Sequence, residues 1–123
     1  MRVRGGGCHC GAVRFEVRGE PEEFTTCNCS ICARRNVPMW MVHKDDLRIV
    51  SGEDRLTLYQ WNTHIARHYF CSVCGIYPFH RKRMAPDHYS VNVHCVDGLV
   101  IGGVPVRETD GLRLSLEDRA PAR

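Results

Sequence analysis

The stretch Cys8-His9-Cys10-Gly11-Ala12-Val13-Arg14-Phe15-Glu16-Val17-Arg18 joins two closely spaced cysteines to a segment of alternating apolar and charged residues. A period of two places Val13, Phe15 and Val17 on one face, as in a half-buried β-strand. Two cysteines in a tight turn can bind one metal ion, and Gly11 tolerates the backbone angles that follow such a bend. The stretch therefore predicts a strand attached to half of a metal site.

Similar alternation recurs in short segments separated by turn residues, which favours antiparallel β-sheets. One short helix is expected over residues 31–36, with Ser30 as its N-cap, and residues 117–123 are expected to fray. Residues 61–64 should form a hairpin connection. The sequence thus predicts a mainly β fold of stacked antiparallel sheets with at most one or two short helices. Further strands are expected at residues 38–43, 47–50, 55–61, 65–70, 88–96 and 112–116.

The 123 residues predict a single domain, 1–123, small enough for metal crosslinks to add considerably to its stability. The net charge of +3 is spread along the chain without the block of like charges that is typical of a nucleic-acid-binding arm. No apolar run approaches the roughly 20 residues that span a membrane, and residues 1–7 lack the apolar core of a signal peptide. We expect a cytoplasmic protein without a membrane or nucleic-acid partner.

Seven of the eight cysteines fall into three clusters. Because a reducing cytosol disfavours disulfides, clustered thiols there are more typical of metal ligands. Their spacings do not match the ferredoxin iron–sulfur patterns, whereas zinc accepts four thiolates in a tetrahedral structural site. Seven thiolates would fill one such site and leave three at a second, with one coordination position open. The first cluster is Cys8 and Cys10, the second is Cys27, Cys29 and Cys32, and the third is Cys71 and Cys74.

Spacing alone allows two partitions of these thiols. The first and third clusters can form a closed zinc site, since Gly75 suits the bend after Cys74, and this would close a loop of about 60 residues. Alternatively, Cys29 and Cys32 can pair with the third cluster as a ribbon-like site, which leaves Cys27 with the first cluster. A further possibility is that the second cluster holds another structural zinc, completed by a distant histidine or by Cys95.

Three motifs in order along the chain, Gly6 to Phe15, Cys27 to Cys32 and Phe70 to Gly75, resemble the glutathione-dependent formaldehyde-activating enzyme family, which includes centromere protein V. The resemblance implies a zinc-binding β fold of the β-tent type with two zinc ions per chain. Family members commonly have His and a basic residue where this sequence has Asn28 and Ala33. The implied ligands are Cys8, Cys10, Cys71 and Cys74 for a structural zinc, and Cys27, Cys29 and Cys32 for a catalytic zinc.

Zinc bound to three thiolates carries a net charge of about −1, so it is poorly suited to making hydroxide from water. A soft site with one vacancy suits an incoming thiol instead. The resemblance implies a carbon–sulfur lyase similar to S-(hydroxymethyl)glutathione synthase, which adds glutathione or a similar thiol to formaldehyde or another small electrophile. The alternative is a non-catalytic, zinc-stabilised binding module for a protein or nucleic-acid partner.

Other residues have both functional and structural interpretations. Arg34 and Arg35 can receive the carboxylates of a glutathione-like substrate, or they can be solvated surface charges. Cys95 is expected to be a small buried hydrophobe, and His9 to contact the first site without binding the ion. Trp40 and residues 77–79 are expected mostly in the core. His88 and His94 lie on the polar face of their strand, where a histidine can shuttle protons.

Overall fold

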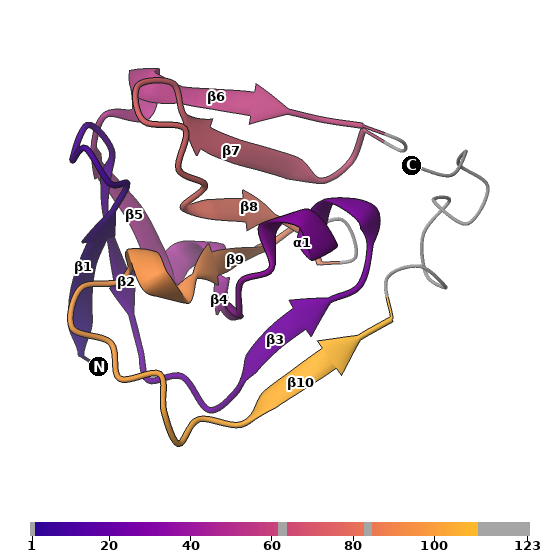
Figure 1. Ribbon diagram of the computed structural model, residues 1–123. Helices are drawn as coiled ribbons and strands as arrows, with labels where there is room; N and C mark the ends of the chain where they lie inside the picture. Colours follow the sequence, from indigo (N-terminus) through magenta and orange to yellow (C-terminus); the bar gives the residue numbers. More distant parts are fainter. Residues whose placement is uncertain (1, 62–63, 83–84, 111–123) are drawn as a thin grey trace.

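The protein is mainly β in the computed structural model, which describes residues 2–61, 64–82 and 85–110 (Figure 1). This outcome confirms the predicted fold class. Within these described ranges one α-helix, α1, spans Ser30–Arg35, and short 3₁₀ turns cover Lys44–Asp46, Glu53–Arg55 and Val93–Cys95. The strands are β1 (Val3–Gly7), β2 (Arg14–Arg18), β3 (Phe24–Cys27), β4 (Met39–His43), β5 (Leu47–Ser51), β6 (Leu56–Tyr59), β7 (Arg67–Cys71), β8 (Phe79–Arg81), β9 (His88–Asn92) and β10 (Val106–Thr109).

The strands form two sheets. The small sheet has the order β1-β2-β5, and the large sheet has the order β10-β3-β4-β9-β8-β7-β6. Among the described residues, all strand pairs are antiparallel except β10 with β3, which run parallel. In Figure 1 the small sheet stands to the left and the large sheet sweeps from β6 at the top to β10 at the bottom.

The core lies where one face of the large sheet meets the small sheet. Phe15 of β2 packs edge-on against Phe79 of β8, with 5.7 Å between ring centroids. Phe79 lies opposite Val91 in the β8–β9 register, so both side chains are on this face. The alternation in β2 thus predicted its buried face correctly. The core cluster contains Phe15, Val17, Phe24, Trp40, Val42, Phe79, Val91, Val93, Cys95 and Val96.

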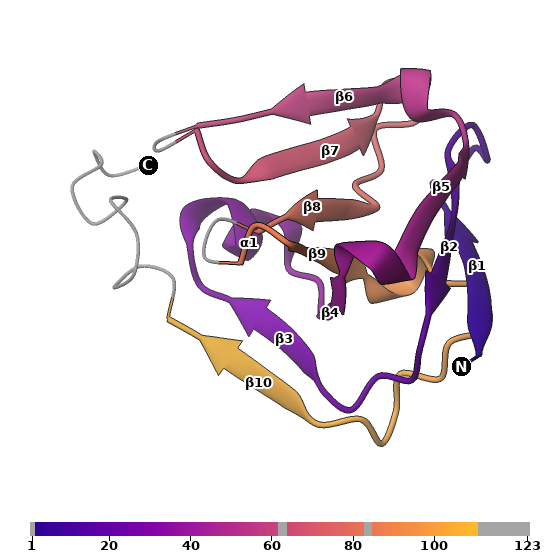
Figure 2. The same ribbon diagram turned by 180° about the vertical axis from the view of Figure 1, so that it is seen from behind.

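The opposite face of the large sheet carries a row of buried polar side chains. His68 of β7 lies opposite His80 of β8, which lies opposite Ser90 of β9. These three side chains are 5%, 9% and 1% exposed. In both views helix α1 lies next to the end of β3 (Figures 1 and 2), and its Arg35 contacts His68 of β7. We call His68, His80 and Ser90 the polar row.

Two local predictions were wrong in detail. Helix α1 begins at Ser30 itself, so the N-cap is Cys29, which makes no side-chain capping hydrogen bond. The strand expected over residues 88–96 ends at Asn92, because the Asn92 side chain accepts a hydrogen bond from the His94 amide and starts a 3₁₀ turn.

Other predicted elements agree with the structure or fall outside its described part. β6 and β7 pair antiparallel, as the hairpin prediction required, although residues 62–63 of the connection are not among those described. The strand expected at residues 112–116 and the frayed tail at 117–123 also lie outside the described residues.

Candidate metal centres

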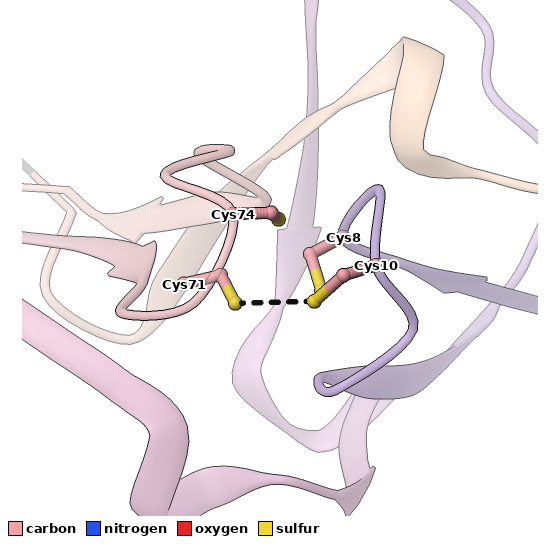
Figure 3. A group of neighbouring side chains, drawn as sticks. All are labelled: Cys8, Cys10, Cys71 and Cys74. Atoms are coloured by element: carbon pink, nitrogen blue, oxygen red, sulfur yellow. Dashed lines mark hydrogen bonds between the residues drawn. The ribbon is translucent and has the colours of Figure 1, made fainter.

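The first candidate site forms where two tight turns meet. Cys8 and Cys10 come from the turn between β1 and β2, while Cys71 ends β7 and Cys74 lies in the turn after it (Figure 3). The first turn is closed by the Cys8 amide donating to the Val13 carbonyl at 3.1 Å. Both turns are followed by glycine with positive φ, 81° at Gly11 and 77° at Gly75, as the bends require.

The sulfur spacing in this site fits one tetrahedral zinc ion. The Sγ atoms of Cys8 and Cys10 are 3.7 Å apart, those of Cys10 and Cys71 are 3.8 Å apart, and all four Sγ atoms lie within 4.8 Å of one another. Bonds of about 2.3 Å at tetrahedral angles give about 3.8 Å between sulfurs. A disulfide would need about 2.05 Å, and the thiols are free. The donor set therefore matches structural zinc in chemistry and spacing.

Backbone amides around this site favour the ionised sulfurs. Val13 donates to Cys8 Sγ at 3.3 Å, and Val73 donates to Cys71 Sγ at 3.4 Å. Burial opposes ionisation of Cys8, but the hydrogen bonds from the Val13 amide and the Cys71 thiol lower its pKa. The amides of Ile76 and Cys10 lower the pKa of Cys74 to about 6. The thiolates of Cys8 and Cys74, the form that binds zinc, are thus favoured. At Cys10 the Ala12 amide also favours the thiolate, but desolvation and the neighbouring thiols raise its pKa to about 11.

The second candidate site is a group of three half-buried thiols at the junction of β3 and α1. Cys27 ends β3, Cys29 is the N-cap of α1, and Cys32 lies in the first turn of the helix. The three Sγ atoms lie within 4.8 Å of one another. Hydrogen bonds from Cys29 and Cys32 lower the pKa of Cys27, whereas the contacts of Cys32 with Cys27 and Cys29 raise the pKa of Cys32, so the thiols ionise unequally.

The structure groups the seven thiols as four and three, not as the ribbon-like partition that spacing also allowed. Within the described residues, no histidine, carboxylate or further cysteine joins the group of three. Cys95 lies elsewhere, with its thiol 3.9 Å from the Tyr77 carbonyl, and it packs in the core as predicted. Burial raises the pKa of Cys95 to about 11, which keeps it a neutral thiol.

Arg35 sits at the end of α1, one helical turn after Cys32. Its Nη1 donates to His68 Nδ1 at 3.0 Å, and the central carbon of its guanidinium lies 3.4 Å from the centroid of the Tyr77 ring. The Tyr77 hydroxyl contacts His80 Nδ1, and the His80 ring is 4.9 Å from that of His68. This closed set of contacts fixes the Arg35 side chain against the polar row.

Burial sets the charge of the groups around Arg35. It lowers the pKa of His68 to about 4, with a further contribution from the Arg35 charge, and it lowers the pKa of His80 well below the usual range. Burial also raises the pKa of Tyr77. Both imidazoles and the phenol are therefore neutral at pH 7, which leaves Arg35 as the charged member of the set.

Lys82 is a second basic residue on this side of the large sheet. It directly follows β8, two residues after His80, and the strand period of two places both side chains on the same face. Lys82 is half-buried; burial lowers its pKa, while the charges of Cys27 and Cys32 act in the opposite direction. Its ammonium group thus lies within electrostatic reach of the three-cysteine group.

The remaining sequence-predicted residues are more dispersed. Arg34 is exposed, and its guanidinium donates to the Ser30 carbonyl at 3.1 Å. His9 is exposed and outside the four-cysteine group, and His94 is exposed beyond β9. The aromatic residues divide between core and site, because Trp40 and Phe79 are buried in the core whereas Tyr77 packs against Arg35.

Sequence reasoning did not single out His68, His80 or Lys82. The available signal was weak: His68 and His80 each lie between an arginine and an aromatic residue, and β8 is only three residues long. Their proximity arises from pairing between strands, which alternation in a single segment does not reveal.

By its fold and its sites, the chain is a mainly β protein with two cysteine groups that can hold metal ions. A family model described as "Glutathione-dependent formaldehyde-activating enzyme" matches residues 3–106, so the chain belongs to that family.

Two relatives support the assignment. A Halomonas elongata protein named "Putative glutathione-dependent formaldehyde-activating enzyme" is 35% identical over 79 residues, which are 57% of this chain. The chain spans about half the length of that relative, since the match covers 50% of it. A crystal structure of a Rhodobacter sphaeroides protein is 41% identical, with a TM-score of 0.79, and the match covers 85% of this chain and 99% of that one.

None of the helices in the described part of the chain is long and apolar enough to cross a bilayer.

Proposed function

We propose that this protein is a zinc-dependent enzyme of the carbon–sulfur lyase type. Its reaction is the reversible addition of a thiol, glutathione or a similar one, to formaldehyde or another small electrophile. Family membership supports a glutathione-related, formaldehyde-activating role. The observation that carries the proposal is the unequal grouping of the thiols, four in one site and three in the other.

Cys8, Cys10, Cys71 and Cys74 would hold a structural zinc, because four thiolates complete a tetrahedron. Cys27, Cys29 and Cys32 would hold the catalytic zinc, which when bound offers one further position to an external thiol and favours its ionised form. The three half-buried side chains present their sulfurs at the start of α1, where a small molecule can reach them.

The proposed reaction is balanced without a further reactant. The thiol loses its proton, its sulfur forms a bond to the aldehyde carbon, and the electron pair of the carbonyl π bond moves to oxygen. That oxygen then takes up one proton, so the product is an S-hydroxyalkyl adduct. In reverse, the carbon–sulfur bond breaks and the thiol and aldehyde are released. We also propose that the chain acts as a single domain in the cytoplasm.

The proposal is tested by replacing one cysteine of the three-cysteine site and, as a control, the cysteine that belongs to neither site. Cys29→Ala should lower the zinc content from two ions per chain to one and abolish glutathione-dependent consumption of formaldehyde. Circular dichroism should show that the sheets remain, because the four-cysteine site is untouched. Cys95→Ala is the matched control, since Cys95 belongs to neither site, and it should keep both ions and turnover.

The proposal is wrong if the purified wild-type protein holds one zinc per chain while the thiols of the second site react freely with an alkylating agent. Full turnover by Cys29→Ala would also reject it. Two zinc ions without any thiol binding would instead indicate a zinc-stabilised binding module.

A further inference from the structure

We propose that Arg35 and Lys82 supply the positive charge that allows the three-cysteine site to accept a fourth thiolate. This inference rests on the proposed function and concerns two basic residues that the chemistry above does not use. It assigns them a role in charge balance at the site, and it requires no carboxylate on the incoming thiol.

The position of Arg35 is fixed by the fold. Arg35 follows Cys32 by three residues on α1, and residues at this spacing lie on one side of a helix with about 5–6 Å between their Cβ atoms. Its guanidinium is held by His68 and by the Tyr77 ring, so it has little freedom to turn away. A buried polar row is costly unless it has partners, and here part of it serves to position one cation.

Lys82 approaches the same site from the sheet. Cys27 is three residues after the core residue Phe24, so the strand period of two places Cys27 on the face opposite the core. Lys82 lies on that face too, as the alternation from Phe79 shows, and its charge interacts with those of Cys27 and Cys32. The site is therefore approached by one cation from the helix and one from the sheet.

The net charge of the proposed zinc site is negative, so nearby cations would offset it. Zn²⁺ with three thiolates sums to −1, and a fourth thiolate would make the sum −2. Within the described residues, no carboxylate lies within ion-pair distance of Arg35 or Lys82, so neither cation is neutralised by an acidic side chain. Two cations beside a four-thiolate centre bring the total to zero, which favours coordination of an incoming thiol with release of its proton to solvent.

The test measures binding of two small thiols to the zinc-loaded protein by titration calorimetry, between about pH 6 and about pH 9. The probes are 2-mercaptoethanol, which has no carboxylate, and 3-mercaptopropionate, which has one. The variants are Arg35→Gln, which removes the charge and keeps an amide donor, and Lys82→Met, which removes the charge and keeps most of the length of the side chain. Zinc content and circular dichroism of each variant verify that both sites and the sheets remain.

Each variant should bind 2-mercaptoethanol about tenfold more weakly at pH 7, since one nearby cation is lost. At a fixed thiol concentration, half-saturation should move up by about one pH unit, because thiolate coordination releases one proton. Arg35→Lys should restore most of the affinity. Arg48→Gln, which removes an exposed charge on the small sheet, should bind like wild type.

Equal binding of 2-mercaptoethanol by the wild type and both variants would overturn the inference. A loss confined to 3-mercaptopropionate would also overturn it, since the two residues would then be anchors for a substrate carboxylate. If the wild type binds neither thiol, the open site itself is absent, and the proposed function fails together with the inference. Should Arg35→Gln not fold, Lys82→Met alone decides the outcome.

Discussion

At Gly6 the backbone of β1 lies close to both the turn after β9 and the Phe15 ring of β2. Its backbone pairs with Val96 in an isolated bridge, and a Cβ atom at this position would lie 2.5 Å from the Cys95 carbonyl oxygen and 2.5 Å from the Phe15 ring. The absence of a side chain here is therefore what allows the small sheet to approach the turn after β9.

Gly6→Ala should destabilise the protein by about 3 kcal/mol, because neither the backbone carbonyl nor the buried ring can move without disturbing the core. The measurement is the urea midpoint of the zinc-loaded protein, with the slope of the transition unchanged. Gly102→Ala is the control: a Cβ atom there meets nothing within 4 Å, and its effect should stay within about 0.5 kcal/mol. Similar midpoints for the two variants would contradict this explanation.

At the scale of single residues, the sequence predicted the cysteines far better than their neighbours. Thiols at short spacing have few uses in the reducing compartment that we expect, so the three clusters and the glycines after the turns could be inferred from chain-local geometry. Spacing left the pairing of the clusters open, and the family resemblance implied the four-and-three grouping. His68 and Lys82 have many possible roles in a sequence. Strand pairing places His68 opposite His80, two residues before Lys82 on the same face of the sheet, and no pattern within one segment of the sequence reveals this.

Helix α1 and the polar row beneath it form the element whose behaviour depends most directly on pH. Arg35 donates to Nδ1 of His68, so that nitrogen must be unprotonated, and the neighbouring charged or titratable groups are Arg35 and His80. In the folded protein the pKa of His68 is about 4, whereas an unfolded histidine has a pKa of about 6.5.

Unfolding therefore takes up a proton between these two pH values, and stability falls as the pH decreases through that window. From about pH 7.5 to about pH 5.5, His68 should account for about 1 kcal/mol of lost unfolding free energy. His68→Gln retains a hydrogen-bonding side chain. Between these two pH values, its unfolding free energy, measured by urea titration, should fall by about 1 kcal/mol less than that of wild type. His94→Gln, at an exposed position outside the polar row, should keep the wild-type pH dependence. Identical pH dependence in wild type and His68→Gln would show that His68 is not held neutral.

At the scale of elements, strands with one buried face were predictable and the others were not. β2 shows alternation because one side faces the core and the other does not, whereas residues 39–42 of β4 are an unbroken apolar run. β1 contains three consecutive glycines, and β8 has only three residues, so neither carries a pattern. β10 pairs in parallel with β3, more than 80 residues earlier, and such a partner is fixed by tertiary structure.

The whole molecule is tied together by the four-cysteine site. The site connects the turn between β1 and β2, in the small sheet, to the end of β7, in the large sheet, and Cys10 and Cys71 are 61 residues apart. Zinc bound there would act as a crosslink between the sheets. A crosslink that closes a loop of this length stabilises the folded state by about 4 kcal/mol if loop entropy alone is considered.

The variant Cys10→Ser measures the contribution of the zinc crosslink to stability separately from that of core packing. Cys10 is exposed, so its replacement removes a zinc ligand without leaving a cavity in the core, unlike replacement of the buried Cys71. In zinc-loaded protein, Cys10→Ser should lower the free energy of unfolding by several kcal/mol, measured in urea. After zinc is removed with a chelator, wild type and Cys10→Ser should have equal stability, because the difference arises from the metal alone. A difference that persists in the metal-free proteins would mean that the turn between β1 and β2 depends on the Cys10 side chain itself, and the loss in the zinc-loaded protein could not then be assigned to the crosslink.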